Sequence, residues 1–221
     1  MHVLLIENNN LDQTESLHTS LKEEGHQVCL VHTPESATQQ TATLWPNLIV
    51  FHPGQGELDV AGFQLAISTA RLDIPHIIVG HKNQFHEGIS NDTILVAPNK
   101  PQQLSQSIQK AIAKQRHRFL RLPALTIDCQ HYNILRNGKC YSLTPKEFKL
   151  LYLLVENRNQ VLSRKKIMQT VWETDYMGDT RTLDVHVRWL REKIEDNPSQ
   201  PQQLITIRGV GYRFMADVEP E

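Results

Sequence analysis

Cysteine is scarce in the 221-residue sequence, and long apolar runs are missing from it. Its three cysteines, Cys29, Cys129 and Cys140, are widely spaced and odd in number, which fits neither a disulfide framework nor a metal site of paired cysteines. No apolar run approaches the ~20 residues that cross a bilayer, and the first residues do not form a basic segment followed by a long apolar one. We therefore expect reduced cysteines and a soluble, cytoplasmic protein with no membrane partner.

The sequence also has few of the features that mark a catalytic site. It contains no glycine-rich phosphate loop, no nucleophile with its base in a recognisable motif, and no cluster of thiols or carboxylates. These absences disfavour an enzyme. We expect no cofactor and no bound metal.

The small net charge of −1 conceals an asymmetry between the two halves of the chain. Residues 1–115 carry 6 Lys+Arg against 11 Asp+Glu, a net of −5, whereas residues 116–221 carry 17 against 13, a net of +4. The second half is therefore the one expected to bind a polyanion. Because an excess of four is modest, binding should also depend on placed contacts and should weaken with salt.

The first half contains five short apolar runs separated by segments of helix length. The runs are residues 3–6, 27–31, 47–51, 76–79 and 93–96. Continuous apolar runs are typical of strands buried on both faces, and their alternation with helices predicts a doubly wound, parallel, five-stranded α/β sheet of the flavodoxin-like class. Thr33 before Pro34 predicts the start of one helix.

A short basic segment that closes with Pro123 marks the boundary between two domains. At 221 residues, the chain is long enough for two domains that each bury a core. We place the first domain at residues 1–118, a linker at 119–123 and a second, α+β domain at 124–221.

Two local patterns organise the start of the second domain. Asn137-Gly138 between apolar runs predicts a β-hairpin. Thr144 and Glu147 have the spacing of a capping box, with proline at the first helical position, which predicts a helix start. Ser163 is expected to cap a second helix that begins with the basic residues 164–166.

Residues 181–194 predict an amphipathic helix with 3.6 residues per turn. One stripe of it must face a core, and its members are Leu183, Val187, Leu190 and Ile194. The other faces present guanidinium, hydroxyl, imidazole and small apolar groups, which suit base edges and phosphates in a DNA major groove. The alternative is a solvated helix stabilised by pairs such as Arg188 with Glu192.

The segment at residues 204–214 favours the DNA-binding interpretation of the helix. Two short β runs flank glycines at a turn, and Arg208 stands at the shoulder of that turn. A helix followed by a hairpin with an arginine at its tip is the layout of a winged helix, in which the arginine can reach the minor groove.

These motifs resemble the DNA-binding domain of OmpR/PhoB-type response regulators. The resemblance is carried by RTLDVHVRWLREK at residues 181–193, TIRGVGYRF at 206–214 and LTPKEF at 143–148. It implies a winged helix that binds double-stranded DNA through Arg181, Thr182, Val185, His186, Arg188, Trp189, Lys193, Arg208 and Tyr212. Trp189 stands where relatives often have a basic residue, so stacking or contact with a thymine methyl group is expected to replace an arginine contact. The loop at residues 172–179 corresponds to one that can meet RNA polymerase in the family.

The same resemblance implies that the first domain is a receiver with a degenerate phosphorylation pocket. Receivers hold two acidic residues after the first strand, an aspartate that accepts the phosphoryl group after the third, a Ser or Thr after the fourth and a Lys after the fifth. The corresponding residues of this chain are Glu7 with Asn8, His52, Gly80 and Ala97. One carboxylate beside an amide and an imidazole is a poor Mg²⁺ site. His52 is interpreted as a polar residue that fills a defunct pocket, with a phosphorylated or metal-bound imidazole as the alternative.

The sequence therefore favours a sequence-specific transcriptional regulator. We expect it to act independently of phosphorylation, as a homodimer through the receiver-like domain and the helix from residue 101 to about 116, on tandem DNA half-sites. Two alternatives remain open. The degenerate receiver could sense another ligand or protein, or the winged helix could be an adaptor that binds protein instead of DNA.

Overall fold

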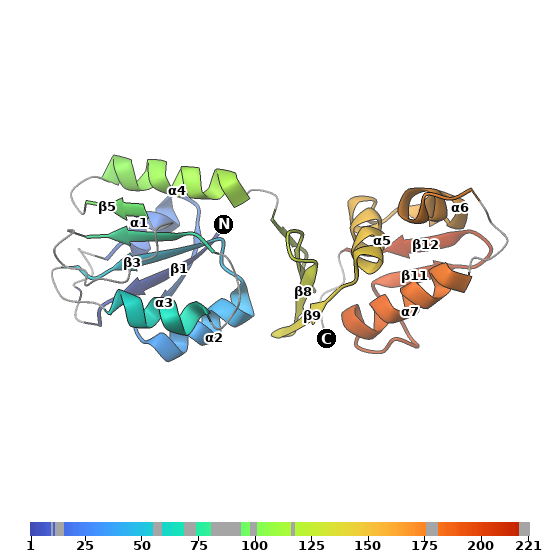
Figure 1. Ribbon diagram of the computed structural model, residues 1–221, viewed down its shortest axis with the longest axis horizontal. Helices are drawn as coiled ribbons and strands as arrows, with labels where there is room; N and C mark the ends of the chain where they lie inside the picture. The colour runs from blue at the N-terminus through green and yellow to red at the C-terminus, as the bar shows by residue number, and fades with distance from the viewer. Residues whose placement is uncertain are drawn as a thin grey trace. The chain divides into compact units, whose positions relative to one another are not determined.

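The computed structural model describes residues 1–9, 11, 16–54, 59–68, 74–80, 94–97, 101–115, 118–175 and 181–216. The chain divides into two compact units, Met1–Arg116 and His117–Glu221, which are described separately (Figure 1). Within these described ranges, no helix combines the length and the apolar character that a membrane span requires.

The first unit is built on a parallel five-stranded sheet. Each of the five apolar runs forms a strand, and the strands are β1 (His2–Glu7), β2 (Gln27–Val31), β3 (Leu48–His52), β4 (His76–Val79) and β5 (Ile94–Val96). Their order across the sheet is β2-β1-β3-β4-β5. This is the strand order of flavodoxin-like, doubly wound proteins, in which ligands bind at the carboxyl ends of the strands.

Helices cover both faces of this sheet because successive residues of each strand point to opposite sides. α1 (His18–Glu23) and α4 (Pro101–Gln115) pack with Val3 and Leu5 on one face, whereas α2 (Pro34–Leu44) and α3 (Val60–Ser68) pack with Leu4 and Ile6 on the other. Figure 1 shows α4 above the sheet and α2 and α3 below it. The predicted start of α2 is confirmed, since the Thr33 side chain accepts a hydrogen bond from the Ser36 amide.

The second unit opens with an antiparallel meander. Its strands are β6 (Phe119–Arg121), β7 (Thr126–Asp128), β8 (Asn133–Arg136) and β9 (Lys139–Ser142). The predicted hairpin joins β8 to β9, with Asn137 and Gly138 at φ angles of 49° and 71°. The predicted linker at residues 119–123 is wrong in part, because residues 119–121 form β6. Arg118, just before β6, forms an ion pair with the buried Asp128 of β7. This pair helps to hold β6 against β7, and the sequence of the segment alone does not reveal it.

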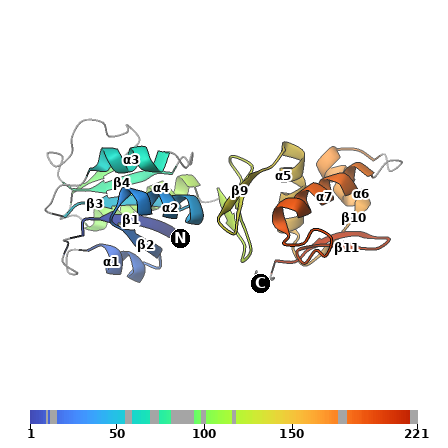
Figure 2. The same ribbon diagram turned by 90° about the horizontal axis from the view of Figure 1, so that it is seen from below.

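The rest of the second unit is a helical cluster on a three-stranded sheet. Along the chain it consists of α5 (Pro145–Glu156), β10 (Val161–Ser163), α6 (Arg164–Ile167), the π-helical turn η2 (Met168–Trp172), α7 (Arg181–Ile194), β11 (Leu204–Ile207) and β12 (Gly211–Phe214). The sheet order is β10-β12-β11. Figure 2 shows α5, α6 and α7 lying together over this sheet.

The two predicted helix starts in this unit are confirmed. Thr144 accepts a hydrogen bond from the Glu147 amide while the Glu147 side chain returns one to the Thr144 amide, which completes the capping box of α5. Ser163 accepts from the Lys166 amide at the start of α6. The apolar stripe of α7 is fully buried in the core, as its spacing predicted; its members are Leu183, Val187, Leu190 and Ile194.

Candidate nucleic-acid interface

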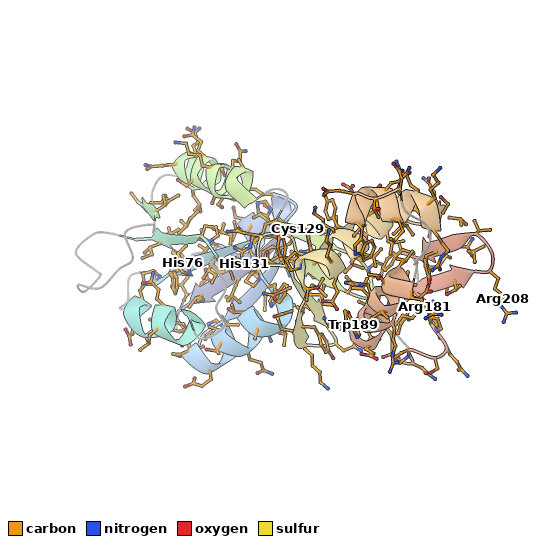
Figure 3. All side chains as sticks on the ribbon, turned by 45° about the vertical axis from the view of Figure 1, so that its right-hand side comes forward. His76, Cys129, His131, Arg181, Trp189 and Arg208 are labelled. Atoms are coloured by element: carbon orange, nitrogen blue, oxygen red, sulfur yellow. The ribbon has the colours of Figure 1, made fainter. Side chains whose placement is uncertain are left out.

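Burial of the apolar stripe turns the remaining faces of α7 outward. Five of the side chains predicted to meet DNA are exposed along it, and they are Arg181, Thr182, Val185, Arg188 and Trp189. Figure 3 shows Arg181 and Trp189 on this helix. Arg188 is paired with Glu192 across 3.0 Å, but the guanidinium side chain is 79% exposed. An exposed pair of this kind contributes little, so Arg188 can exchange Glu192 for a DNA group.

His186 lies between two tryptophans on one flank of α7. Its ring centroid is 5.0 Å from that of Trp172 and 5.0 Å from that of Trp189. Nδ1 of His186 is 2.8 Å from the carbonyl oxygen of Thr182. Because a carbonyl oxygen only accepts, Nδ1 is the donor in this contact. The flank therefore holds the His186 ring and the partly exposed Trp189 indole in contact.

The turn between β11 and β12 presents the predicted arginine. Arg208 is exposed and extends from the tip of this hairpin (Figure 3). Gly209 has a φ of +75°, a left-handed conformation that glycine adopts without strain. At the base of the turn, a Cβ on Gly211 would lie 2.0 Å from the Leu162 carbonyl oxygen, so glycine allows β12 to approach β10 closely.

Tyr212 is engaged within the protein. Its side chain is buried in the core, and its hydroxyl donates a hydrogen bond of 2.5 Å to Oδ1 of Asp184. The same oxygen lies 2.8 Å from the Arg164 guanidinium. A contact between Tyr212 and phosphates stays a prediction; within the protein, the phenol joins the hairpin to the first turn of α7.

This network perturbs the acidity of its members. Burial raises the pKa of Asp184, but hydrogen bonds from Arg164 and Tyr212 outweigh burial and hold that pKa below its usual range. Burial and the neighbouring Asp184 carboxylate raise the pKa of the Tyr212 phenol. Both directions favour an ionised Asp184 and a neutral, donating Tyr212 at physiological pH. Sequence reasoning missed this cluster, since its three members are distant along the chain.

Lys193 is also engaged within the protein. Its Nζ lies 2.7 Å from Oε1 of Glu147 and donates to the Ser142 carbonyl oxygen across 3.1 Å. Burial raises the pKa of Glu147, but the hydrogen bond from Lys193 and the capping interactions with Thr144 outweigh burial. The pKa of Glu147 therefore lies below its usual range. A DNA contact by Lys193 stays a prediction, and it would require the ammonium group to be shared with, or released from, the buried Glu147 carboxylate.

The three basic residues at the start of α6 have different surroundings. Arg164 is held by Asp184 and Tyr212, whereas Lys165 and Lys166 are exposed and remain candidates for phosphate contact. In the loop that follows η2, the exposed Glu173 pairs with Lys149 across 3.2 Å. Residues 176–179 of the predicted polymerase-contacting loop lie outside the described residues.

In the first unit, strand register brings two of the predicted pocket residues together. Glu7 at the end of β1 is opposite His52 at the end of β3, and Nδ1 of His52 lies 3.0 Å from Oε1 of Glu7. Glu7 also accepts hydrogen bonds from Ser16 Oγ at 2.6 Å and from the Leu17 amide at 2.8 Å. Burial raises the pKa of Glu7, but these three donors outweigh burial and lower the pKa.

The other pocket residues add little polar chemistry. Gly80 follows β4 and donates its amide to the Val96 carbonyl oxygen at 2.9 Å, and Ala97 follows β5. Neither side chain has an oxygen or nitrogen atom, and Asn8 offers only a neutral amide. Among the residues that the structure describes, no group of three or more His, Cys, Asp or Glu side chains is arranged to hold a metal ion. Of the four described strand ends that the resemblance singles out, Glu7 alone provides a carboxylate; it is buried and already bonded to three donors, an arrangement that suits Mg²⁺ poorly.

A hollow of about 430 Å³ adjoins Glu7 at the carboxyl ends of β1 and β2. It is lined by Glu7, Asn8, Asn9, Leu11, Ser16, His18, Thr19, Leu30 and His32. His32 is fixed there by a 2.9 Å contact between its Nδ1 and the Glu7 carbonyl oxygen. The polar end of the sheet is thus open on the β2 side of the Glu7–His52 pair.

Comparison with known proteins identifies relatives of this chain. The family described as "Transcriptional regulatory protein, C terminal" matches residues 138–214. The chain is 46% identical over 95 residues to the alkaline phosphatase synthesis transcriptional regulatory protein SphR of Synechococcus elongatus, which covers 43% of this chain and 37% of SphR. It is 32% identical over 221 residues to the transcriptional regulatory protein AfsQ1 of Streptomyces coelicolor, which covers 96% of this chain and 97% of AfsQ1.

A solved structure is similar to part of the chain. The DNA-binding domain of Klebsiella pneumoniae RstA, in complex with the RstA box, is 28% identical and has a TM-score of 0.42. The similarity covers 45% of this chain and 99% of that chain.

Proposed function

The chain belongs to the OmpR/PhoB family of response regulators and is a DNA-binding transcriptional regulator of that type, and we propose that it acts on DNA as a phosphorylation-independent dimer. In this proposal α7 is the recognition helix, which enters the major groove with Arg181 and Arg188. The hairpin of β11 and β12 is the wing, and its Arg208 approaches the minor groove. Support comes from the exposed Arg181 and Arg188 side chains of α7 and the exposed arginine of the wing.

The observation that carries phosphorylation independence is the Glu7–His52 pair. His52 stands at the end of β3, where the family resemblance implies the aspartate that accepts a phosphoryl group. The imidazole is buried, and its Nδ1 is bonded to the Glu7 carboxylate at 3.0 Å. Among the described residues, this pocket presents a single carboxylate that is buried and bonded to three donors, which does not offer the metal and cation charge that offset a transferred phosphoryl group. The pair instead places an imidazole against the Glu7 carboxylate, at the strand end where receivers hold the acceptor aspartate.

A direct test is treatment of the full chain with a small-molecule phosphodonor and Mg²⁺, followed by intact-mass measurement and DNA titration. We expect no gain of a phosphoryl group and no change in DNA affinity. A regulator with an intact aspartate pocket, treated in parallel, shows that the donor is active. Gain of one phosphoryl group together with tighter DNA binding would contradict the proposal.

The proposed dimer uses the outward face of α4. Its inward residues pack on the sheet, while Gln102, Gln106 and Gln109 are exposed on the other side. These amides are uncharged and can pair with their copies across a two-fold axis without charge repulsion. The double substitution Gln106→Glu with Gln109→Glu would place like charges opposite one another and is expected to shift the protein to monomers in sedimentation experiments. Gln39→Glu with Ala42→Glu on the exposed face of α2 is the matched control.

Tandem half-sites follow from a dimer whose DNA-binding units are tethered to it by short connections. Selection from a random-sequence pool should return two copies of one motif, spaced close to one helical turn, about 10 base pairs. A selected site with a single copy, bound by a monomer, would contradict this part of the proposal.

Contact with RNA polymerase is proposed for the loop at residues 172–179. Support comes from its described part, where Glu173 is exposed beside the half-buried Trp172. Glu173→Lys is expected to weaken retention of polymerase on promoter DNA carrying the regulator, while binding of the regulator to that DNA is unchanged. Equal retention would argue against a role for this part of the loop.

A further inference from the structure

We propose that Val185 and Trp189 form a hydrophobic reading surface that selects thymine through its 5-methyl group in the DNA major groove. The proposal rests on the DNA-binding function stated above and specifies what the recognition helix reads. It assigns a base preference to two side chains that cannot act through charge.

The starting observation is an unusual exposure of apolar side chains on a charged helix. Val185 is 41% exposed and Trp189 is 44% exposed. Four residues apart, they are neighbours on the same outward face of α7, and the exposed Arg181, Arg188 and Glu192 side chains lie along one flank of that face. Core packing explains neither side chain, because the buried stripe of α7 is formed by other residues. A partner that offers apolar groups within an anionic surface would explain both.

The Trp189 indole is supported before any ligand arrives. Its ring centroid lies 5.0 Å from that of His186, with the planes inclined by 60°. His186 is held in turn by the Thr182 carbonyl oxygen at 2.8 Å and by the Trp172 ring, whose plane is inclined to it by 83°. A large aromatic side chain that is fixed on one side loses little conformational freedom when its open side is covered.

The chemistry of the surface identifies the group that covers it. In the major groove every base edge presents hydrogen-bond donors or acceptors, and the thymine methyl is the single apolar group. Valine has no polar side-chain atom, and the indole has only one N–H donor. The two arginines along one flank of this surface favour DNA over an apolar protein partner because they can pair with phosphates.

Helix geometry sets the spacing of the expected bases. Four residues of α-helix rise about 6 Å, and successive base pairs are separated by about 3.4 Å. The two side chains should therefore meet thymines within about two base-pair steps of each other. The selected half-site is expected to contain such a pair of thymines on the edge that α7 reads.

The test replaces thymine by uracil, which removes the methyl group and keeps every hydrogen-bonding atom. Each thymine of the selected site is exchanged in turn, and the affinity of the full chain is measured. At the contacted positions we expect a loss of about fourfold, corresponding to about 0.8 kcal/mol for one buried methyl group. Val185→Ala and Trp189→Ala should each lose the thymine preference at one position while still binding the uracil duplex. Trp189→Phe should retain part of it.

Arg188→Ala is the matched control, since it should weaken binding to thymine and uracil duplexes by the same factor. Two results would overturn the proposal: equal affinity of the unsubstituted protein for all thymine and uracil duplexes, or thymine preferences that survive in both alanine variants. Either result leaves DNA binding intact. Failure to bind any duplex at low salt would overturn the proposed function as well, so the two failures are distinguishable.

Discussion

The hydroxyl of Tyr212 is bonded to Oδ1 of Asp184 at 2.5 Å, which joins the second strand of the wing to the first turn of the recognition helix. Arg164 reaches the same carboxylate oxygen at 2.8 Å, and its own amide donates to the Val210 carbonyl oxygen at 3.1 Å. Three elements that are separate in the sequence are thereby fixed around one carboxylate. The major-groove and wing contacts are expected to depend on this junction.

We predict that Tyr212→Phe weakens DNA binding through the wing. The substitution keeps the ring in the core but removes a hydrogen bond to a charged group, which contributes about 1.5–3 kcal/mol to stability. With the junction loosened, Arg208 should be less well placed. The cost of Arg208→Ala should therefore be smaller in the Tyr212→Phe background than in the unsubstituted protein, as measured by a double-mutant cycle of DNA affinities. Tyr132→Phe, at an exposed tyrosine of the meander, is the control.

Asp184→Asn tests whether Asp184 affects DNA binding by positioning the wing and α7 or only through its negative charge. If Asp184 acted only through its charge, removing a negative group beside DNA would strengthen binding. We expect weaker binding instead, because Arg164 loses its ionic partner and the first turn of α7 is less firmly held. A gain in affinity with an unchanged response to Arg208→Ala would contradict a positioning role.

Lys193→Met is predicted to reduce stability much more than DNA binding. The Glu147 side chain is only 2% exposed and would lose the ammonium group that lies 2.7 Å away. Leaving a buried charged group short of a partner costs about 1–3 kcal/mol, and Glu147 keeps its capping contacts with Thr144. Urea unfolding of the full chain measures this loss, with the exposed Lys165→Met as the matched control. The salt dependence of DNA binding should not change if Lys193 stays paired with Glu147 on DNA; a smaller slope would place the ammonium group at a phosphate.

Asp128→Asn is predicted to flatten the acid side of the stability profile. Burial raises the pKa of Asp128, but hydrogen bonds from Arg118 and His131 outweigh burial, so the folded pKa lies below the usual range. A carboxyl group with a lowered folded pKa stabilises the folded state at pH values above its unfolded pKa, which is about 3.9 for aspartate. This stabilisation is lost as the pH falls through the folded pKa. The asparagine variant should be less stable than the unsubstituted protein at pH 7. Their difference should shrink below about pH 4; a constant difference from pH 7 to pH 2 would contradict the assignment.

The sequence predicts the fold well where the determining contacts are local. The α5 capping box needs only Thr144 and Glu147, three residues apart, and the β8–β9 hairpin needs only Asn137-Gly138. The buried stripe of α7 follows from the helical repeat alone. Each of these features is fixed by neighbours in the chain, so pattern and propensity suffice.

The site is less predictable because distant residues decide it. Lys193 and Tyr212 lie in the segments that resemble a DNA-binding motif, yet Lys193 meets Glu147 46 residues away and Tyr212 meets Asp184 28 residues away. The direction of a side chain at the edge of a helical face depends on which carboxylate the tertiary fold brings near. The β1–β3 register likewise pairs Glu7 with His52, which separate inspection of the two strand ends does not reveal.

Arg208→Ala tests whether the wing meets DNA phosphates in the minor groove. Each cation that neutralises a phosphate contributes about 0.9 to the slope of log affinity against log salt concentration. The exposed guanidinium at the hairpin tip is expected to make one such contact, so the variant should bind more weakly and its slope should be smaller by about 0.9. Lys139→Ala, at an exposed cation on β9, should leave the slope unchanged. If Arg208→Ala lowers affinity without altering the slope, the arginine acts through a neutral base edge, and the preference should then follow the sequence beneath the wing.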